Sequence, residues 1–177
     1  MNSLVILFSR AKRYILGKQY SMDNSEAFSM LEGAVRRAVK MQVVHDKDKF
    51  DHPACAYQND RLRTLAMVAR ESGNERNFEF RTLKPRMFGA GGFNSQHSKT
   101  WIIDGEIYVD GSANLTGQST RNFESILVTR ERTVLVAAAA ALDEAWQAAE
   151  EVPYDTRLTL PEHVDTRSKS RSASKAR

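Results

Sequence analysis

Segments with the apolar spacing of strands alternate along most of the chain with segments that have the spacing of helices. The spacing predicts helices over residues 25–40, 61–72 and 133–150, and strands over residues 14–21, 41–45, 78–83, 99–104, 107–109 and 123–129. Such alternation is typical of the α/β class, and we expect a layered sheet flanked by helices on both faces. Asp104-Gly105 is a turn dipeptide between two β-rich runs and predicts a hairpin, so the sheet should be mixed.

Local signals indicate where several of these elements begin and end. Asn24 or Ser25 can cap the first helix, and Gly73 can end the second. The charged run over residues 45–60 predicts a loop, and residues 88–93, with three glycines, predict a flexible loop.

The length of 177 residues is enough for one hydrophobic core, and we expect a single domain per chain. The expected parts are a short N-terminal segment at residues 1–10, the main domain over 11–152, and a C-terminal extension over 153–177. The Ser/Lys/Arg-rich tail at 167–177 should be disordered. Cys55 is the single cysteine, which excludes an internal disulfide and a thiolate zinc cluster.

Positive charge is distributed unevenly along the chain. The net charge is +4, but residues 167–177 carry five basic residues and no acid, so residues 1–166 have a net charge of −1. Residues 80–103 contain no acid, and this run provides three candidate contacts for an anionic substrate, namely Arg81, Lys84 and Arg86.

The N-terminus gives no clear targeting signal. Residues 4–8 are apolar, but the run is short for a signal peptide and basic residues follow it. Residues before Asp23 contain no acid, as in a mitochondrial presequence, yet residues 14–21 fit a core strand better. No run is long enough to cross a membrane. A cytoplasmic location is favoured, and a mitochondrial or exported form stays open.

The pattern with the clearest chemistry is His-x-Lys-x4-Asp at residues 97–104, followed by Gly-Ser-x-Asn at residues 111–114. His97 and Lys99 are two residues apart, so on a strand they point to the same face. Asn114 follows the predicted hairpin and can return to that face. An imidazole, an ammonium group and neutral hydrogen-bond donors suit attack on a phosphodiester. We expect neither a metal nor a cofactor.

This pattern resembles that of the phospholipase D superfamily, and in particular its small, single-motif bacterial endonucleases. Asn114-Leu-Thr116 and Asn122-Phe-Glu124 extend the similarity, which covers about residues 11–149. The resemblance implies that His97 attacks phosphorus to form a phosphohistidine, and that Glu124 accepts its Nδ1 proton. Asp104 in relatives is more structural than chemical, and its place at a tight turn indicates the same. The candidate catalytic residues are His97, Lys99, Asp104, Ser112, Asn114 and Glu124.

The motif occurs only once, although the reaction needs both a nucleophile and an acid for the leaving oxygen. Relatives with two motifs take the acid from the second copy. We therefore expect a homodimer, in which a second His97 from the partner chain completes one composite site on the two-fold axis.

Three functions fit these residues. The first is a non-specific endonuclease that cleaves DNA or RNA, which the acid-free run beside the motif favours. The second is a phospholipid hydrolase similar to mitochondrial cardiolipin hydrolases, for which residues 4–8 would be the only membrane contact. The third is an inactive homologue that binds nucleic acid, and the complete motif argues against it.

Overall fold

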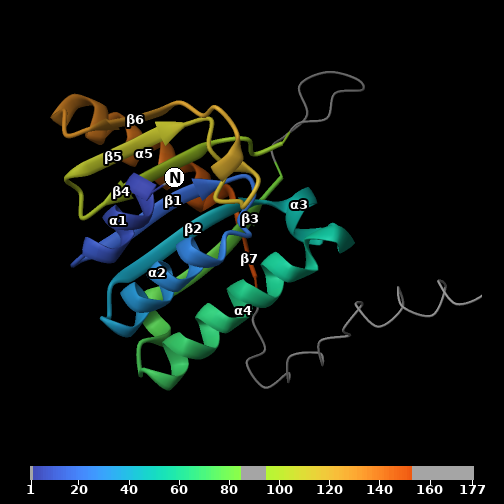
Figure 1. Ribbon diagram of the computed structural model, residues 1–177. Helices are drawn as coiled ribbons and strands as arrows, with labels where there is room; N and C mark the ends of the chain where they lie inside the picture. Colours follow the sequence, from blue (N-terminus) through green and yellow to red (C-terminus); the bar gives the residue numbers. More distant parts are fainter. Residues whose placement is uncertain (1, 85–94, 153–177) are drawn as a thin grey trace, which may run out of the picture.

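The computed structural model describes residues 2–84 and 95–152 of the chain (Figure 1). Within these residues, seven strands form one sheet in the order β6-β5-β4-β1-β2-β3-β7. The strands are β1 (Tyr14–Gln19), β2 (Lys40–Asp46), β3 (Phe78–Leu83), β4 (Lys99–Ile103), β5 (Ile107–Gly111), β6 (Ile126–Thr129) and β7 (Glu150–Glu151). The helices are α1 (Asn2–Arg10), α2 (Ser25–Arg36), α3 (Lys47–Asp51), α4 (Ala56–Glu71) and α5 (Arg132–Ala148).

The sheet is mixed, as the sequence predicts. Strands β1, β2 and β3 are parallel, whereas β4, β5 and β6 follow antiparallel from β1 and β7 pairs antiparallel with β3. The carboxyl ends of β1, β2, β3 and β5 therefore share one edge of the sheet with the first residues of β4 and β6. We call this edge the carboxyl edge.

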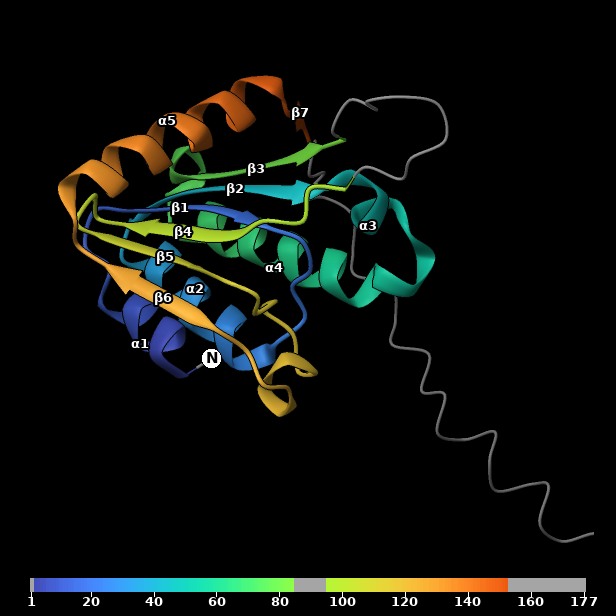
Figure 2. The same ribbon diagram turned by 90° about the horizontal axis from the view of Figure 1, so that it is seen from above.

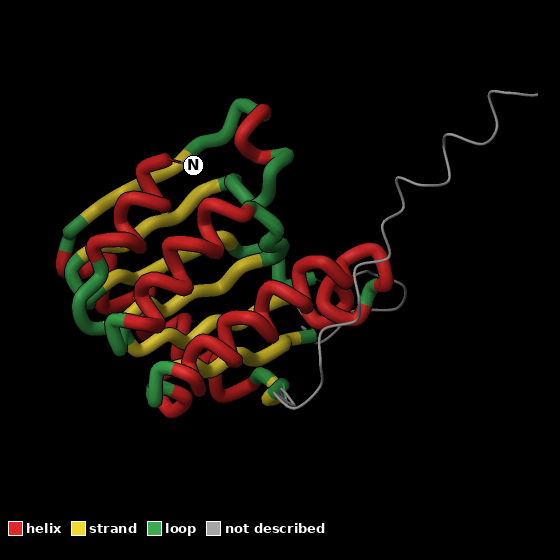
Figure 3. The backbone as a smooth tube through the Cα atoms, turned by 60° about the horizontal axis from the view of Figure 1, so that its bottom comes forward, coloured by secondary structure: helices red, strands yellow, loops and turns green. Residues whose placement is uncertain are grey.

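Helices cover both faces of the sheet unequally. Helices α1, α2 and α4 lie side by side on one face, and α5 crosses the other (Figures 2 and 3). The main core lies under the three helices and includes Phe8, Leu31 and Trp101. The core under α5 is small, with Ile102, Leu135 and Leu142 as its buried residues.

The expected caps and turns are present. Asn24 accepts a hydrogen bond from the backbone nitrogen of Ala27 and so begins α2. Gly73 follows α4 with a φ of +66°. Asp104 and Gly105 have φ angles of +56° and +71°, as both central residues of a type I′ hairpin turn require.

The local structure differs from the sequence-based prediction in several places. The helix predicted over residues 25–40 ends at Arg36, and Lys40 already belongs to β2. The expected loop at residues 45–60 contains α3 and the first turn of α4, because Asp46 caps α3 through the backbone nitrogen of Lys49. Strand β6 begins at Ile126 rather than at residue 123. Residues 2–10 form helix α1, and its buried side chains belong to the main core: Leu4, Val5 and Phe8. The predicted loop at 88–93 and tail at 167–177 lie outside the described residues.

Candidate active site

The carboxyl edge brings the predicted catalytic residues His97, Lys99, Ser112 and Asn114 to one side of the sheet. Lys99 is the first residue of β4 and His97 precedes it, while Ser112 and Asn114 follow the end of β5. Lys99 pairs across the sheet with Gln19, on the face that α1, α2 and α4 cover. The side chain of Lys99 is buried, whereas that of His97 is exposed to solvent.

The side chains of Lys99 and His97 are in direct contact. The Nζ atom of Lys99 lies 2.9 Å from Nδ1 of His97 and donates to the carbonyl oxygen of the same residue at 2.6 Å. An ammonium group has no lone pair, so a charged Lys99 makes Nδ1 the acceptor and leaves the proton of neutral His97 on Nε2.

Burial and charge shift the pKa values of both groups. Although the His97 side chain is exposed to solvent, partial desolvation of its ring and then the neighbouring Lys99 ammonium lower the pKa of His97, while Asp46 opposes this. Burial lowers the pKa of Lys99, and Glu124 partly offsets the effect. The imidazole is therefore held in its neutral form at neutral pH.

A buried glutamine links Asn114 to the centre of the sheet. Gln19, the last residue of β1, accepts a hydrogen bond from the indole of Trp101 at 3.2 Å. Its amide nitrogen donates to the backbone of Ser21 at 3.1 Å and lies 3.5 Å from Oδ1 of Asn114. This arrangement leaves the amide NH₂ group of Asn114 free of that contact and available to a ligand.

Glu124 does not contact His97, contrary to the prediction from the family resemblance. Its carboxylate accepts a hydrogen bond from Ser112 at 2.5 Å, and the Asn122 amide lies 3.4 Å away. The hydrogen bond from Ser112 is the main reason that the pKa of Glu124 is lowered. Among the described residues, Nδ1 of His97 instead has Lys99 as its partner, because the turn after β5 directs Glu124 toward Ser112.

Gly111 explains why the motif needs a glycine before Ser112. A Cβ atom at this position would collide with the carbonyl oxygen of Ser125. The close approach allows Ser112 to exchange backbone and side-chain hydrogen bonds with Ser125. The absence of a side chain at Gly111 therefore allows Ser112, and with it Glu124, to lie next to the start of β6.

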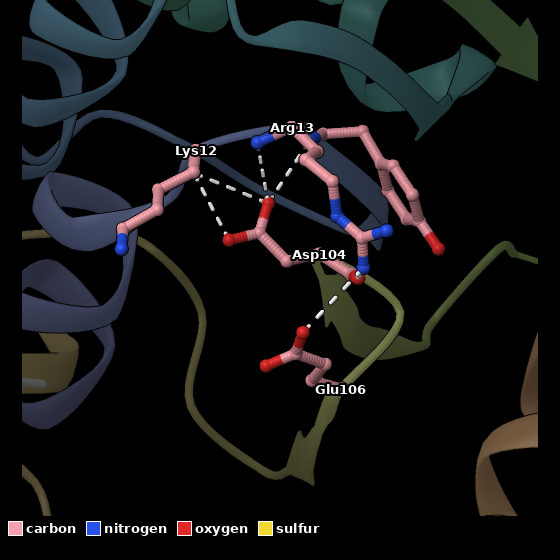
Figure 4. Close-up of polar contacts among 5 residues, drawn as sticks. Lys12, Arg13, Asp104 and Glu106 are labelled. Atoms are coloured by element: carbon pink, nitrogen blue, oxygen red, sulfur yellow. Dashed lines mark hydrogen bonds and ion pairs between the residues drawn. The ribbon is translucent and has the colours of Figure 1, made fainter.

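Asp104 lies at the opposite edge of the sheet from His97, since the five-residue β4, about 17 Å long, runs between the two. Its carboxylate accepts hydrogen bonds from the backbone nitrogens of Lys12, Arg13 and Tyr14, which join α1 to β1 (Figure 4). Burial raises the pKa of Asp104, but the hydrogen bonds from these three amides together lower it by more, so the net shift of the pKa is downward. In the structure, Asp104 therefore stabilises the connection between α1 and β1 and lies away from His97.

The supporting residues Asp46 and Gln96 were not found from the sequence. Asp46 is buried, and while one carboxylate oxygen caps α3, the other accepts a hydrogen bond from the backbone of Gln96 at 2.7 Å. Gln96 in turn accepts from the backbone of Ser98 at 2.7 Å. These bonds fix the segment that carries His97, and a carboxylate that directly follows an apolar strand was the available signal.

The predicted substrate contacts in the basic run are not supported. Arg81 donates to the carbonyl oxygen of Trp146 and to Glu151, and its guanidinium lies 4.3 Å from the Trp146 ring centroid, so it fastens α5 to the sheet. Lys84 forms an ion pair with Asp48 at 2.9 Å. Arg86 lies outside the described residues. A charge run does not show which cations already have partners.

No group of three or more His, Cys, Asp or Glu side chains within residues 2–84 and 95–152 is arranged to hold a metal ion. Helices in the same described ranges are all too short or too polar to span a membrane.

The comparison with protein families gives a clear result. The family described as "Cardiolipin synthase, PLD-like domain" matches residues 4–146. The chain therefore belongs to this phospholipase D-like family, as the motif predicts. No curated protein matches the chain.

Solved structures confirm the fold. NucT from Helicobacter pylori has a TM-score of 0.70 at 19% identity, and Nuc from Salmonella typhimurium, a phospholipase D family member, has 0.65 at 20%. In both cases the similarity covers 85% of this chain and 89% of the other. TrmBL2, an archaeal chromatin protein with a novel mode of DNA binding, has 0.57 at 18%, covering 85% of this chain and 50% of its own.

Proposed function

We propose that the protein is a phosphodiesterase that cleaves nucleic acid through a covalent intermediate on His97. The observation that carries the proposal is the direct contact between the solvent-exposed His97 and the buried Lys99, beside Asn114, at the carboxyl edge. A nucleophile, a fixed cation and an amide donor are the groups that attack on a phosphodiester requires.

In the first step, Nε2 of His97 attacks phosphorus, an N–P bond forms, and the P–O bond to the leaving alcohol breaks. Lys99 and Asn114 stabilise the charge that builds on the other phosphoryl oxygens. In the second step, water attacks the phosphohistidine, which releases a phosphomonoester and restores the imidazole. We propose that the residues supply this chemistry without a metal.

The reaction requires a change in the hydrogen bonds of His97. Attack by Nε2 needs the tautomer with the proton on Nδ1, whereas a charged Lys99 favours the proton on Nε2. A bound phosphate competes for the ammonium of Lys99, because an anion is a stronger acceptor than a neutral imidazole. Substrate binding therefore releases Nδ1 and favours the nucleophilic tautomer.

The leaving oxygen needs an acid, and we propose that a second His97 from a two-fold partner supplies it. His45 lies near the carboxyl edge, but it is fully buried and its Nδ1 bonds to the carbonyl oxygen of Asp46. A partner surface is available beside the site: Phe123 is fully exposed, and the edge strand β6 exposes Leu127 and Val128.

One observation favours nucleic acid over lipid, the second candidate substrate. The apolar run at residues 4–8 was the expected membrane contact, but Leu4, Val5 and Phe8 are buried in the main core. The family description names a lipid enzyme, whereas one structural neighbour binds DNA. We therefore place nucleic acid first.

Incubation with plasmid, single-stranded DNA, RNA and phospholipid vesicles, each in excess EDTA, tests the proposal. We expect cleavage of nucleic acid and loss of turnover in His97→Asn with the fold retained. Cleavage of lipid alone would reverse the order of the two candidates, and activity that EDTA abolishes would contradict the metal-free mechanism.

A further inference from the structure

Tyr20, which is not part of the sequence motif, lies beside His97 and two lysine ammonium groups. Its ring centroid is 4.6 Å from that of His97, at an interplanar angle of 54°. The ammonium of Lys99 lies 5.1 Å from the Tyr20 centroid, and the ammonium of Lys49 lies 5.3 Å from it. Lys49, from α3, is thus as close to this ring as the motif lysine is.

The position of Lys49 is coupled to that of His97 through one carboxylate. Asp46 accepts a hydrogen bond from the backbone nitrogen of Lys49 at 2.8 Å and another from Gln96, the residue before His97. Both segments are therefore fixed to the end of β2, and Lys49 is held beside the site by the fold.

The cations at this edge differ in whether an acid neutralises them. Lys47 and Lys84 form ion pairs with Glu150 and Asp48. In contrast, neither Lys49 nor Lys99 forms an ion pair with any residue of the described ranges.

The nearby carboxylates are already engaged. Asp46 accepts from two backbone amides, and Glu124 accepts from Ser112. Because no carboxylate of the described residues lies within ion-pair distance of either ammonium group, the two positive charges beside the Tyr20 ring repel each other, and the cluster favours a ligand that brings more than one negative charge.

We propose that Lys49 binds a phosphate next to the scissile one, so that the site prefers a polynucleotide over a diester with one phosphate. Lys99 contacts the phosphate under attack, Lys49 contacts its neighbour on the same strand, and both ammonium groups lie against the Tyr20 ring. This inference rests on the proposed function and specifies its substrate class.

Salt dependence of binding tests the inference directly. A single-stranded oligonucleotide is titrated with the His97→Asn protein, which binds without cleavage, at several salt concentrations. When the substitution Lys49→Gln is combined with His97→Asn in the same protein, the magnitude of the slope of log K against log salt should fall by about 0.7, the value for one lost phosphate contact on a single strand. Lys47→Gln is the matched control from the same helix, since Lys47 is already paired with Glu150.

Kinetics provide a second readout in proteins with His97 intact. In Lys49→Gln, the ratio of kcat/KM for the oligonucleotide to that for bis(p-nitrophenyl) phosphate should fall about tenfold, or about 1.4 kcal/mol. An unchanged slope, or an equal loss for both substrates, would overturn the role of Lys49. Failure of the wild-type protein to cleave either diester would instead refute the proposed function, and the binding slopes would still decide on Lys49.

Discussion

Lys99 donates a hydrogen bond to Nδ1 of His97, with the two nitrogen atoms 2.9 Å apart, so a buried cation controls both the charge and the tautomer of the candidate nucleophile. The contact keeps the imidazole neutral, because protonation would place two positive charges side by side. It also keeps the proton on Nε2, the nitrogen that must attack, until an anion binds the Lys99 ammonium in place of Nδ1.

The first prediction concerns the protonation of His97. Its pKa should lie below the ordinary value of 6.5, because partial desolvation of the ring and the Lys99 charge both disfavour the imidazolium. The neutral imidazole of one chain is the nucleophile, and the protonated imidazole of the partner's His97 is the acid for the leaving oxygen, so activity should peak near this lowered pKa, below 6.5, and fall on both sides of it. Titration of the His97 ring protons by NMR measures the shift. Lys99→Met should raise this pKa, and an unchanged value would contradict the role of the charge.

The second prediction concerns the amide of Asn114. Asn114→Ala removes a donor to the phosphoryl oxygens and should lower kcat by about 10²-fold to 10³-fold, as loss of such donors does elsewhere. Asn77→Ala is a control, since it makes the same chemical change before β3, at the opposite edge. Equal effects of the two substitutions on kcat would show that Asn114 has no special place.

The third prediction separates Asp104 from the chemistry. Asp104→Asn keeps a residue type that tolerates a positive φ but removes the charge that accepts three backbone hydrogen bonds. The free energy of unfolding should fall by about 1–3 kcal/mol, with kcat of the folded protein retained. Urea unfolding and kinetics at saturating substrate measure the two quantities.

The effect of Asp104 should depend on pH in a defined direction. Its folded pKa is lowered, so its contribution to stability is complete above the unfolded pKa of about 3.9 and is lost as the pH falls through the folded pKa. The difference in stability between the wild-type protein and Asp104→Asn should therefore narrow in acid. A difference in unfolding free energy that grows toward low pH would contradict the stabilising role of the Asp104 carboxylate.

The fourth prediction concerns the partner surface. Phe123→Ser should raise the dissociation constant of the dimer at least about tenfold while leaving the monomer folded, because this side chain is fully exposed in a single chain. Sedimentation and the concentration dependence of activity measure the change. Val136→Ser, at an exposed aliphatic position on α5, serves as the control. A wild-type monomer that is fully active at dilution would remove the need for a partner.

The sequence predicted correctly those structural features that depend on a few neighbouring residues. The Asp104-Gly105 turn, the Asn24 cap and strand β3 were found because each depends on a few neighbouring residues. Helix α1 was missed, since a nine-residue apolar segment acquires its helical structure by packing against α2 and the sheet. Its burial is a tertiary effect that periodicity in so short a segment does not reveal.

The candidate site was predicted in part. His97, Lys99 and Asn114 meet at one edge because strand alternation and a hairpin suffice to bring them together. The partner of Glu124 was wrong, because it depends on how the chain turns between β5 and β6. Tyr20 and Lys49 were missed, since their proximity arises from β1 and α3 meeting at the carboxyl edge.

The sparse packing of α5 has a consequence for how the protein opens. Only Leu135, Leu142 and Ala145 of this helix are buried, and a partly open pocket of about 80 Å³ lies between it and the sheet. Arg81 holds its last turn through Trp146. Helix α5 should therefore detach as a separate cooperative unit, with its amide hydrogens exchanging before those of β1 and β4. Because none of the residues placed in the chemistry belongs to α5, the protein could lose this layer transiently and still hold its reactive groups in register.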